Sequence, residues 1–256
     1  MKKQLPLNEN KKDAYTVGQY LKESKTSFNY MIDYTLLKPH LTIDAIKEHC
    51  EVAKENNCYA VCIYPEYVST ASAFLEDSKV KICTVISFPK GDASTIEKVR
   101  EADKAISDGA EEIDMVLNWK KLKKMTELDS TSEEYETEYN DLLDDVKQVA
   151  YICHKNGVTL KVIIESGELT FEQIKIACDI CIDGNADFVK TSTGFSPSGV
   201  GAELEKVKYM RKILPDYIKI KASGGIRSQE DVEKFATYVD RIGTSVIPGS
   251  NQKSTY

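Results

Sequence analysis

The sequence lacks an apolar run long enough to cross a lipid bilayer. A spanning helix takes about 18 to 20 consecutive apolar residues, and no stretch of the 256 residues approaches that length. The first ten residues, MKKQLPLNEN, carry basic side chains but lack the apolar centre of a secretory signal. We therefore expect no membrane partner and a cytoplasmic location.

Residues at metal-ligand spacing are also scarce. His40, His49 and His154 are scattered, and none belongs to an HxH or HExxH pattern. The seven cysteines are an odd number and mostly lie in apolar runs, while the pair Cys178 and Cys181 falls in a helix-like segment without partner ligands. We predict free, buried thiols in a reducing compartment, and neither a metal site nor a cofactor.

Positive charge is in deficit. The chain has 34 Lys and Arg against 41 Asp and Glu, which gives a formal net charge of -7 and a pI near 5.2. Phosphate backbones are bound through a surplus of Lys and Arg, so nucleic acid is excluded as a bulk partner, although a local basic pocket is not. Neither GxGxxG nor GxxxxGK[ST] is present to open a helix, so the common nucleotide-binding loops are missing as well.

What the sequence does contain is an alternation of short β-branched runs with amphipathic stretches. Strands are predicted at residues 28–34, 59–64, 80–87, 112–117, 158–164, 186–190, 217–221 and 241–244. Helices are predicted at residues 13–25, 42–56, 65–75, 93–107, 139–155, 171–182, 202–214 and 229–238. This order implies a parallel sheet with crossover helices. Eight units in about 250 residues favour a (β/α)8 TIM barrel over the alternative, an open doubly wound sheet.

One domain is expected over residues 1–256, with an extra N-terminal helix and a shortened C-terminal end. We predict disorder for residues 1–12 and a flexible tail for residues 248–256, which are too short and polar for a full last helix. Residues 119–138, a basic run followed by an acidic one, are interpreted as a polar, solvated insertion.

Reactive side chains fall at strand ends, where the active sites of barrels lie. Lys190 and Lys221 end the sixth and seventh predicted strands, so two ammonium groups would share one pocket. A free lysine has a pKa of about 10.4, whereas attack on an aldehyde needs the neutral amine, which a neighbouring cation and desolvation favour. Asp114 could then move protons, and Asp33 shares a strand face with Thr35. The alternative for the two lysines is that they point into solvent.

A phosphate site is predicted from two loops. Gly224 and Gly225 follow the seventh strand and precede a helix beginning at Gln229, so that backbone amides and the helix N-terminus would both favour an anion. After the eighth strand, Gly243 is followed by the hydroxyl residues Thr244 and Ser245. Phosphate-binding barrels often use these two loops; the alternative for the glycine pair is a mere tight turn.

These segments resemble the deoxyribose-phosphate aldolase family, from about residue 29 to residue 245. The resemblance is carried by IDYTLLKP (32–39), AVCIYP (60–65), FPKG (88–91), EIDMV (112–116), KVIIE (161–165), FVKTSTGF (188–195) and KASGGIR (221–227). Seven matches in the same order, each at a strand end, make chance similarity very improbable.

The resemblance implies a class I aldolase that reversibly cleaves 2-deoxy-D-ribose 5-phosphate to D-glyceraldehyde 3-phosphate and acetaldehyde, in deoxyribose phosphate catabolism. Lys190 would form the Schiff base, Lys221 would favour its neutral amine, Asp114 would relay protons and Asp33 would hold Lys221. Substrate contacts are implied for Thr35, Cys62, Thr193, Gly194, Gly224, Gly225, Gly243, Thr244 and Ser245. The partner implied is a phosphosugar, and because such barrels often pair we expect a homodimer or higher homo-oligomer.

Three departures and two rival functions remain open. Phe195 stands where some members carry a lysine near the phosphate, Lys219 shares a strand face with Lys221 and could join the charge cluster, and most of the last helix is missing. Tyr256 resembles a terminal tyrosine that some members use in proton transfer. The rivals are a lysine-imine aldolase for another phosphosugar and a non-catalytic phosphosugar-binding barrel.

Overall fold

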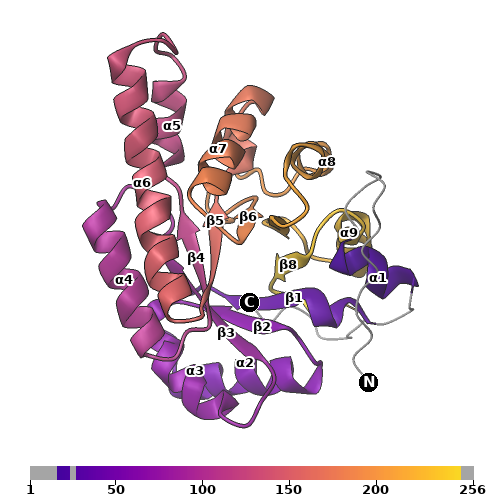
Figure 1. The fold of residues 1–256 in the computed structure, drawn as a ribbon. Coiled ribbons are helices and arrows are strands. Elements are labelled where there is room, and N and C mark those ends of the chain that lie inside the picture. The colour runs from indigo at the N-terminus through magenta and orange to yellow at the C-terminus, as the bar shows by residue number, and fades with distance from the viewer. Residues whose placement is uncertain (1–15, 24–26, 249–256) are drawn as a thin grey trace.

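Eight parallel strands close into a barrel in the computed structural model, which describes residues 16–23 and 27–248 (Figure 1). The strands are β1 (Ile32–Leu36), β2 (Ala60–Ile63), β3 (Lys81–Ile86), β4 (Glu112–Val116), β5 (Thr159–Ile163), β6 (Phe188–Lys190), β7 (Lys219–Ser223) and β8 (Arg241–Thr244). Each strand pairs with the next, and β8 returns to β1, so the sheet has no edge. The predicted (β/α)8 barrel is confirmed.

Helices surround the barrel, as Figure 1 shows. They are α1 (Val17–Glu23), α2 (Ile43–Glu55), α3 (Val68–Leu75), α4 (Thr95–Ser107), α5 (Trp119–Met125), α6 (Glu133–Lys155), α7 (Phe171–Asp183), α8 (Leu204–Ile213) and α9 (Gln229–Ala236), with 3-10 turns η1 (Phe28–Met31), η2 (Pro65–Tyr67) and η3 (Ser166–Glu168). Thr42, Ser94 and Thr170 cap α2, α4 and α7 with their hydroxyl groups, which explains why these starts could be read from the sequence. Among the described residues no helix is both long and apolar enough to span a membrane.

The strands separate the apolar core beneath the helices from a charged interior around the barrel axis. On β4, Ile113 and Met115 face the helices and belong to the apolar core, whereas Glu112 and Asp114 alternate with them and face the barrel axis. The ionisable side chains brought together inside the barrel are Asp33, Glu112, Asp114, Lys161, Lys190, Lys221 and Arg241. Such a concentration of buried charge is costly unless paired, and it marks the interior as the functional region.

The prediction for the first strand is wrong at its start. Residues Phe28–Met31 form the 3-10 turn η1, and β1 begins at Ile32. Ser27 initiates this turn by accepting a hydrogen bond from the Asn29 amide at 3.2 Å. The strand also extends to Leu36, two residues past the predicted end, so Thr35 lies within β1.

Residues 119–138 are not a solvated insertion throughout: residues 119–125 pack against the barrel, whereas none of residues 126–138 is buried. Trp119, Leu122 and Met125 are spaced three apart and are all buried under one face of α5, while the lysines between them face outward. Helix α6 begins at Glu133, six residues earlier than predicted, after the cap Ser132. Helices α5 and α6 lie side by side at the upper end of Figure 1.

At the C-terminal end, no helix follows β8 within the described residues. Helix α1 takes part of that place: it packs against α9, and the Thr16 hydroxyl donates to the Thr237 carbonyl at 3.1 Å. Gly18 lies so close to Ala236 that a Cβ atom there would meet its carbonyl oxygen. The predictions for residues 1–12 and for the tail from residue 249 onward fall outside the described residues.

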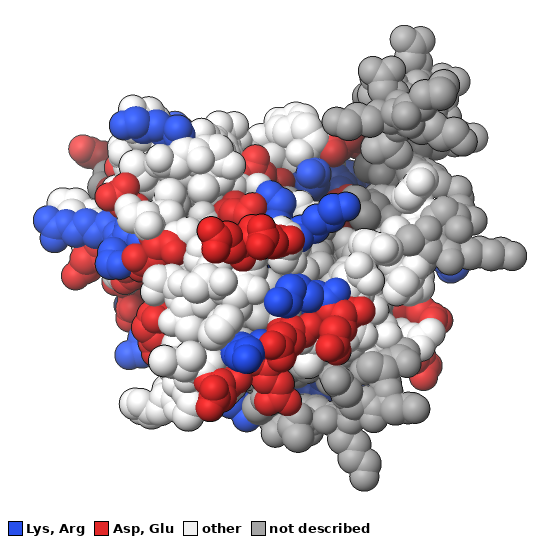
Figure 2. Space-filling model, turned by 90° about the horizontal axis from the view of Figure 1, so that it is seen from below, with Lys and Arg blue, Asp and Glu red and all other residues white. Residues whose placement is uncertain are grey.

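The surface seen in Figure 2 carries acidic and basic side chains interspersed, with apolar area between them. No broad basic face is visible from this side, in keeping with the net charge of -7. This face therefore offers no electrostatic footprint for a nucleic acid.

Candidate active site

Lys190 and Lys221 converge on a single carboxylate oxygen. They are directly opposite in the parallel register of β6 and β7, so both side chains leave the sheet on the same side. Asp114 Oδ2 accepts hydrogen bonds from Lys190 Nζ at 2.7 Å and from Lys221 Nζ at 2.8 Å. Asp114 and Lys221 are fully buried, and Lys190 retains 3% exposure. The structure thus brings together the three residues singled out from the strand ends, instead of sending the lysines into solvent.

Lys221 is held as a cation. Burial alone would lower its pKa, but the carboxylates of Asp114 and Asp33 outweigh burial and raise it. Asp33 contacts Lys221 directly and also accepts from Arg241 Nη1 at 2.7 Å. The pKa of Asp33 is lowered because Lys221 and Arg241 outweigh its burial. Lys221 lies in the middle of β7 rather than at its end, since the strand begins two residues later than predicted and keeps the same facing.

Lys161 was not predicted as a site residue. It is fully buried and donates to Asp114 Oδ1 at 2.8 Å, and its Nζ lies 2.6 Å from Glu112 Oε2. Burial would lower its pKa, but Asp114 and the neighbouring acidic groups raise it well above the ordinary value. Arg241, also missed, bridges Glu112 and Asp33. A second layer of charge therefore lies beneath the lysine pair.

The charge count of this cluster is informative. Three carboxylates face four cations, Lys161, Lys190, Lys221 and Arg241. Asp114 is surrounded by three of these ammonium groups, which outweigh its burial and hold its pKa well below the ordinary range. The cluster therefore holds one more cationic side chain than carboxylates.

Thr35 and Cys62 flank this cluster on adjacent strands, in direct register. The Thr35 hydroxyl donates to the Asp33 carbonyl at 2.8 Å and keeps lone pairs for a ligand. Cys62 is buried beside Cys83, and the hydrogen bond between the two thiols lowers the pKa of Cys62.

Thr193 is more constrained than expected for a substrate contact. Its hydroxyl donates to Glu165 Oε2 at 2.6 Å and accepts from the Phe195 amide at 2.9 Å, and its amide donates to Glu165 Oε1 at 3.1 Å. Glu165 adopts left-handed backbone torsions at the end of β5, and burial raises its pKa. Glu165, which sequence reasoning missed, therefore fixes the loop that follows Lys190.

The loops after β6 and β7 form a glycine-lined surface. Gly194, Gly224 and Gly225 have φ values of +85°, +85° and +78°, where L side chains are strained. A Cβ on Gly224 would lie 3.0 Å from the Gly201 Cα and 3.2 Å from the Ser192 Cβ, whereas Gly194 and Gly225 face open space. The backbone is therefore accessible where an anion was predicted.

Other parts of the predicted phosphate site make hydrogen bonds within the chain or are exposed. The Thr244 hydroxyl donates to the Ile226 carbonyl at 2.7 Å, and Ser245 is exposed. The N-terminus of α9 already carries a negative group, because Asp231 accepts from the amides of Arg227 and Ser228, both at 3.0 Å. The expected help from this helix N-terminus is thus offset by the chain itself.

Gly243 leaves space for the side chain of Lys221, whereas the sequence analysis placed it in a phosphate-binding loop. A Cβ at this position would lie 3.1 Å from Lys221 Cε. Glycine therefore leaves room for Lys221 to cross the barrel interior toward Asp114.

Phe195 and Lys219 were noted above as departures from the family pattern, and the structure shows where both side chains lie. Phe195 is 53% exposed and packs edge-on against Phe88, with ring centroids 5.4 Å apart. Lys219 is exposed, with its Nζ 5.4 Å from the Phe188 ring centroid, so it does not join the cluster. Tyr256 lies outside the described residues.

The histidines stay apart from this site. His49 is buried, stacks on Tyr34 and has its Nε2 3.0 Å from the Tyr34 carbonyl oxygen; burial lowers its pKa to about 4. His154 pairs with Asp187 at 3.0 Å. His40 is exposed and has left-handed backbone torsions, with φ of 59°.

A sequence signal for the missed residues did exist. Glu112, Lys161 and Arg241 occupy alternate positions in otherwise apolar strands, where a charged side chain must face a polar interior. They do not lie at the C-terminal strand ends, where the active sites of barrels are expected.

Comparison with known proteins agrees with this geometry. Residues 29–242 match the DeoC/LacD family of aldolases. Two similar proteins are the deoxyribose-phosphate aldolases of Caldanaerobacter subterraneus subsp. tengcongensis, 45% identical over 87% of this chain and 91% of that protein, and of Mycoplasma pneumoniae, 42% identical over 86% and 92%.

Solved structures extend the similarity. An aldolase described as QR15 is 39% identical, covers 85% of this chain and 90% of its own, and superposes with a TM-score of 0.75. The deoxyribose phosphate aldolase of Aeropyrum pernix is 28% identical, covers 85% and 86%, and gives a TM-score of 0.73. Fold, interior lysines and sequence similarity together lead to one conclusion: the chain belongs to the DeoC/LacD family of aldolases.

Proposed function

We propose that this chain is a class I deoxyribose-phosphate aldolase. It cleaves 2-deoxy-D-ribose 5-phosphate reversibly to D-glyceraldehyde 3-phosphate and acetaldehyde through a Schiff base on Lys190. The observation that carries the proposal is the single Asp114 oxygen shared by Lys190 and Lys221 inside a closed barrel. The relatives named above as deoxyribose-phosphate aldolases support the choice of substrate.

Lys190 is the proposed nucleophile because it is the least enclosed lysine of the cluster. Its side chain retains 4% exposure, whereas those of Lys161 and Lys221 retain none. The neutral amine attacks the aldehyde carbon of the open-chain sugar, and loss of water gives the imine. The hydroxyl group on the carbon that is cleaved off gives up its proton to a base, the imine accepts the electrons of the breaking carbon–carbon bond, and glyceraldehyde 3-phosphate leaves. The resulting enamine is protonated on carbon, and hydrolysis of the imine so formed releases acetaldehyde and regenerates Lys190.

Asp114 is the proposed proton carrier. It lies within hydrogen-bond reach of Lys190 and can take and return a proton during carbinolamine and imine formation. Lys221 serves as the permanent cation that disfavours a second positive charge on Lys190. Asp33 keeps Lys221 charged and in place.

The sugar phosphate is proposed to lie over the glycine loops. Gly194, Gly224 and Gly225 leave the backbone accessible there, which supports anion binding through amide groups. Thr35 and Cys62 line the same interior nearer the lysines and suit the sugar hydroxyl groups. Gly243, Thr244 and Ser245 complete the site, the first two mainly by shaping it.

Trapping with borohydride tests the proposal. Reduction in the presence of acetaldehyde should add one two-carbon unit to Lys190, identified by peptide mass mapping, and deoxyribose 5-phosphate should give the same adduct. A Lys190→Met protein should show neither the adduct nor retro-aldol activity. Absence of an adduct on any lysine of folded protein would instead favour the non-catalytic phosphosugar-binding barrel.

We further propose a cytoplasmic homo-oligomer. The seven cysteines are all free and buried, which supports a reducing compartment. The Aeropyrum pernix relative is described as a tetramer, which supports self-association. Light scattering of the purified chain gives the molar mass that decides this.

A further inference from the structure

Six buried ionisable side chains form a closed ring of alternating charge inside the barrel, which we call the charge ring. In order around the ring, its members are Arg241, Asp33, Lys221, Asp114, Lys161 and Glu112. Each cation contacts a carboxylate on either side, so the ring is neutral when all six groups are ionised. Lys190 is attached to the ring from outside, through its 2.7 Å hydrogen bond to Asp114.

Arg241 is the branch point of the charge ring. Its Nη1 donates to Asp33 Oδ1 at 2.7 Å and to Glu112 Oε2 at 3.0 Å. The guanidinium carbon lies 3.3 Å from the centroid of the Tyr59 ring, and the side chain is 4% exposed. A guanidinium is suited to this place, because it stacks on aromatic rings and offers several donors in one plane. One side chain therefore fixes the two carboxylates from which the arms of the ring start.

The two arms meet on one carboxylate. From Asp33 the first arm passes through Lys221, which donates to Asp114 Oδ2 at 2.8 Å. From Glu112 the second arm passes through Lys161, whose Nζ lies 2.6 Å from Glu112 Oε2 and donates to Asp114 Oδ1 at 2.8 Å. Both oxygens of the proposed proton carrier are thereby held by the ring.

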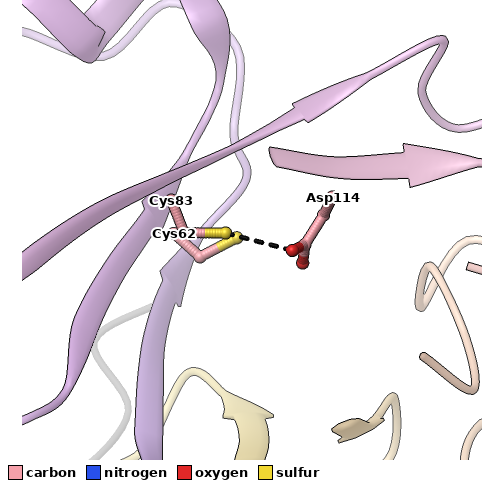
Figure 3. Close-up of side chains that lie close together, drawn as sticks. All are labelled: Cys62, Cys83 and Asp114. Atoms are coloured by element: carbon pink, nitrogen blue, oxygen red, sulfur yellow. Dashed lines mark hydrogen bonds between the residues drawn. The ribbon is translucent and has the colours of Figure 1, made fainter. Parts of the chain in front are cut away.

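Three further titratable groups lie near Lys190. Figure 3 shows the sulfur atoms of Cys62 on β2 and Cys83 on β3 pointing toward Asp114. Burial raises the pKa of Cys83 well above its ordinary value, whereas the hydrogen bond with Cys83 lowers the pKa of Cys62. Glu165 follows β5, and burial raises its pKa. With the charge ring, whose members lie on β1, β4, β5, β7 and β8, these groups come from every strand around β6.

We propose that Glu112 and Arg241 are positioning residues for the proposed aldol reaction, which close the charge ring and so set the pH at which Lys190 becomes a neutral nucleophile. Both residues begin their strands, β4 and β8, and lie at the end of the barrel opposite the loops proposed to bind the sugar phosphate. They act through the ring members that contact Asp114. The inference rests on the proposed function, but it gives a role to two residues that the mechanism above leaves unused.

The contacts of the ring limit the distances over which these charges act. Along the arm through Lys161 and Asp114, Glu112 Oε2 is no more than about 10 Å from Lys190 Nζ, and Arg241 Nη1 no more than about 13 Å. At an effective dielectric constant of about 20, a unit charge at either distance shifts a protonation equilibrium by about one pH unit. Loss of the negative charge disfavours the ammonium form of Lys190, and loss of the positive charge favours it.

The test is the pH profile of imine formation by the full chain. Acetaldehyde is trapped on Lys190 with cyanoborohydride between about pH 5 and pH 10, and the reduction step is common to all variants. The midpoint of the profile should fall by about one pH unit in Glu112→Gln and rise by about one pH unit in Arg241→Gln. The double variant loses one charge of each sign, so its midpoint should return to within about 0.3 pH units of that of the unaltered chain.

Both single variants leave the other members of the ring paired. In Glu112→Gln, Lys161 keeps Asp114 and Arg241 keeps Asp33. Arg241→Gln leaves each of its two carboxylates with a lysine. Circular dichroism melting shows whether each variant is folded. Because the two substitutions have opposite expected signs, either one decides the matter if the other does not fold.

Two controls separate charge from packing. Arg241→Lys keeps the positive charge without the planar fork, so it should lower the melting temperature and leave the midpoint in place. Lys219→Met removes an exposed cation that lies 5.4 Å from the Phe188 ring, which Arg241 approaches to 5.5 Å, and should also leave the midpoint unchanged.

The inference is overturned if Glu112→Gln and Arg241→Gln slow trapping without moving the midpoint, or if both move it in the same direction. In that case the adduct on Lys190 of the unaltered chain would still support the proposed function. Absence of any adduct on the unaltered chain would overturn the proposed function, and this inference with it.

Discussion

Replacement of Lys221 by methionine isolates the effect of one charge on the nucleophile. Methionine keeps an unbranched side chain of similar length and removes the cation. No carboxylate is left unpaired, because Asp33 keeps Arg241 and Asp114 keeps Lys161 and Lys190. The cluster then has three cations and three carboxylates with Lys190 protonated, so loss of the Lys190 proton would now leave excess negative charge.

The magnitude follows from the geometry. Lys190 Nζ and Lys221 Nζ bond the same oxygen at 2.7 Å and 2.8 Å, so they are no more than about 5.5 Å apart. At an effective dielectric constant of about 20, two unit charges at that distance repel by about 3 kcal/mol. An energy of about 3 kcal/mol corresponds to about two factors of ten, so we expect Lys221→Met to lose about 100-fold in kcat near neutral pH.

The assay is the initial rate of deoxyribose 5-phosphate cleavage as a function of pH, together with the rate of borohydride-trapped adduct formation on Lys190. Because the deficit is one of deprotonation, it should narrow as the pH rises toward about 10. Lys219→Met is the matched control, since it removes an exposed lysine of the same strand and should change kcat by less than about twofold. A Lys221→Met protein with normal activity, or with a deficit that does not depend on pH, would refute the reasoning.

Three other perturbations give separate tests. Gly243→Ala places a Cβ 3.1 Å from Lys221 Cε, so we expect a loss of about 1 to 2 kcal/mol in stability and a lower kcat, measured by denaturant unfolding and steady-state kinetics; unchanged kinetics would contradict the role of Gly243. Glu165→Gln weakens the bonds to the Thr193 amide and hydroxyl, and should raise KM for the phosphorylated sugar about 10-fold, whereas an effect on kcat alone would not fit. Since the folded-state pKa of Asp33 is lowered, its stabilising contribution is present above the unfolded value of about 3.9 and is lost as the pH falls. The melting temperature should therefore decrease at pH values below about 5, and Asp33→Asn should make the melting temperature depend less on pH in that range.

The sequence by itself determined the fold class and the reactive groups. Alternating β-branched and amphipathic runs specify parallel strands with crossover helices, and local periodicity is enough to read them. Lys190 and Lys221 could be paired because adjacent parallel strands end on the same side. Residues 119–138 were predicted to be a solvated insertion from their charged composition alone. That composition hides the apolar stripe formed by Trp119, Leu122 and Met125.

Only the tertiary structure decided how the charges are shared. Asp33, Asp114 and Lys161 are far apart in the sequence. The register of β4 and β5 sets Asp114 beside Lys161, and closure of the barrel brings Asp33 of β1 to Lys161 across the barrel axis. The pairing of β3 with β4 places Cys83 against Asp114. Strand register and barrel closure fix such contacts, and neither is a local property of the chain. The residue types in the barrel interior can therefore be read from the sequence, while their pairing and protonation follow from the folded geometry.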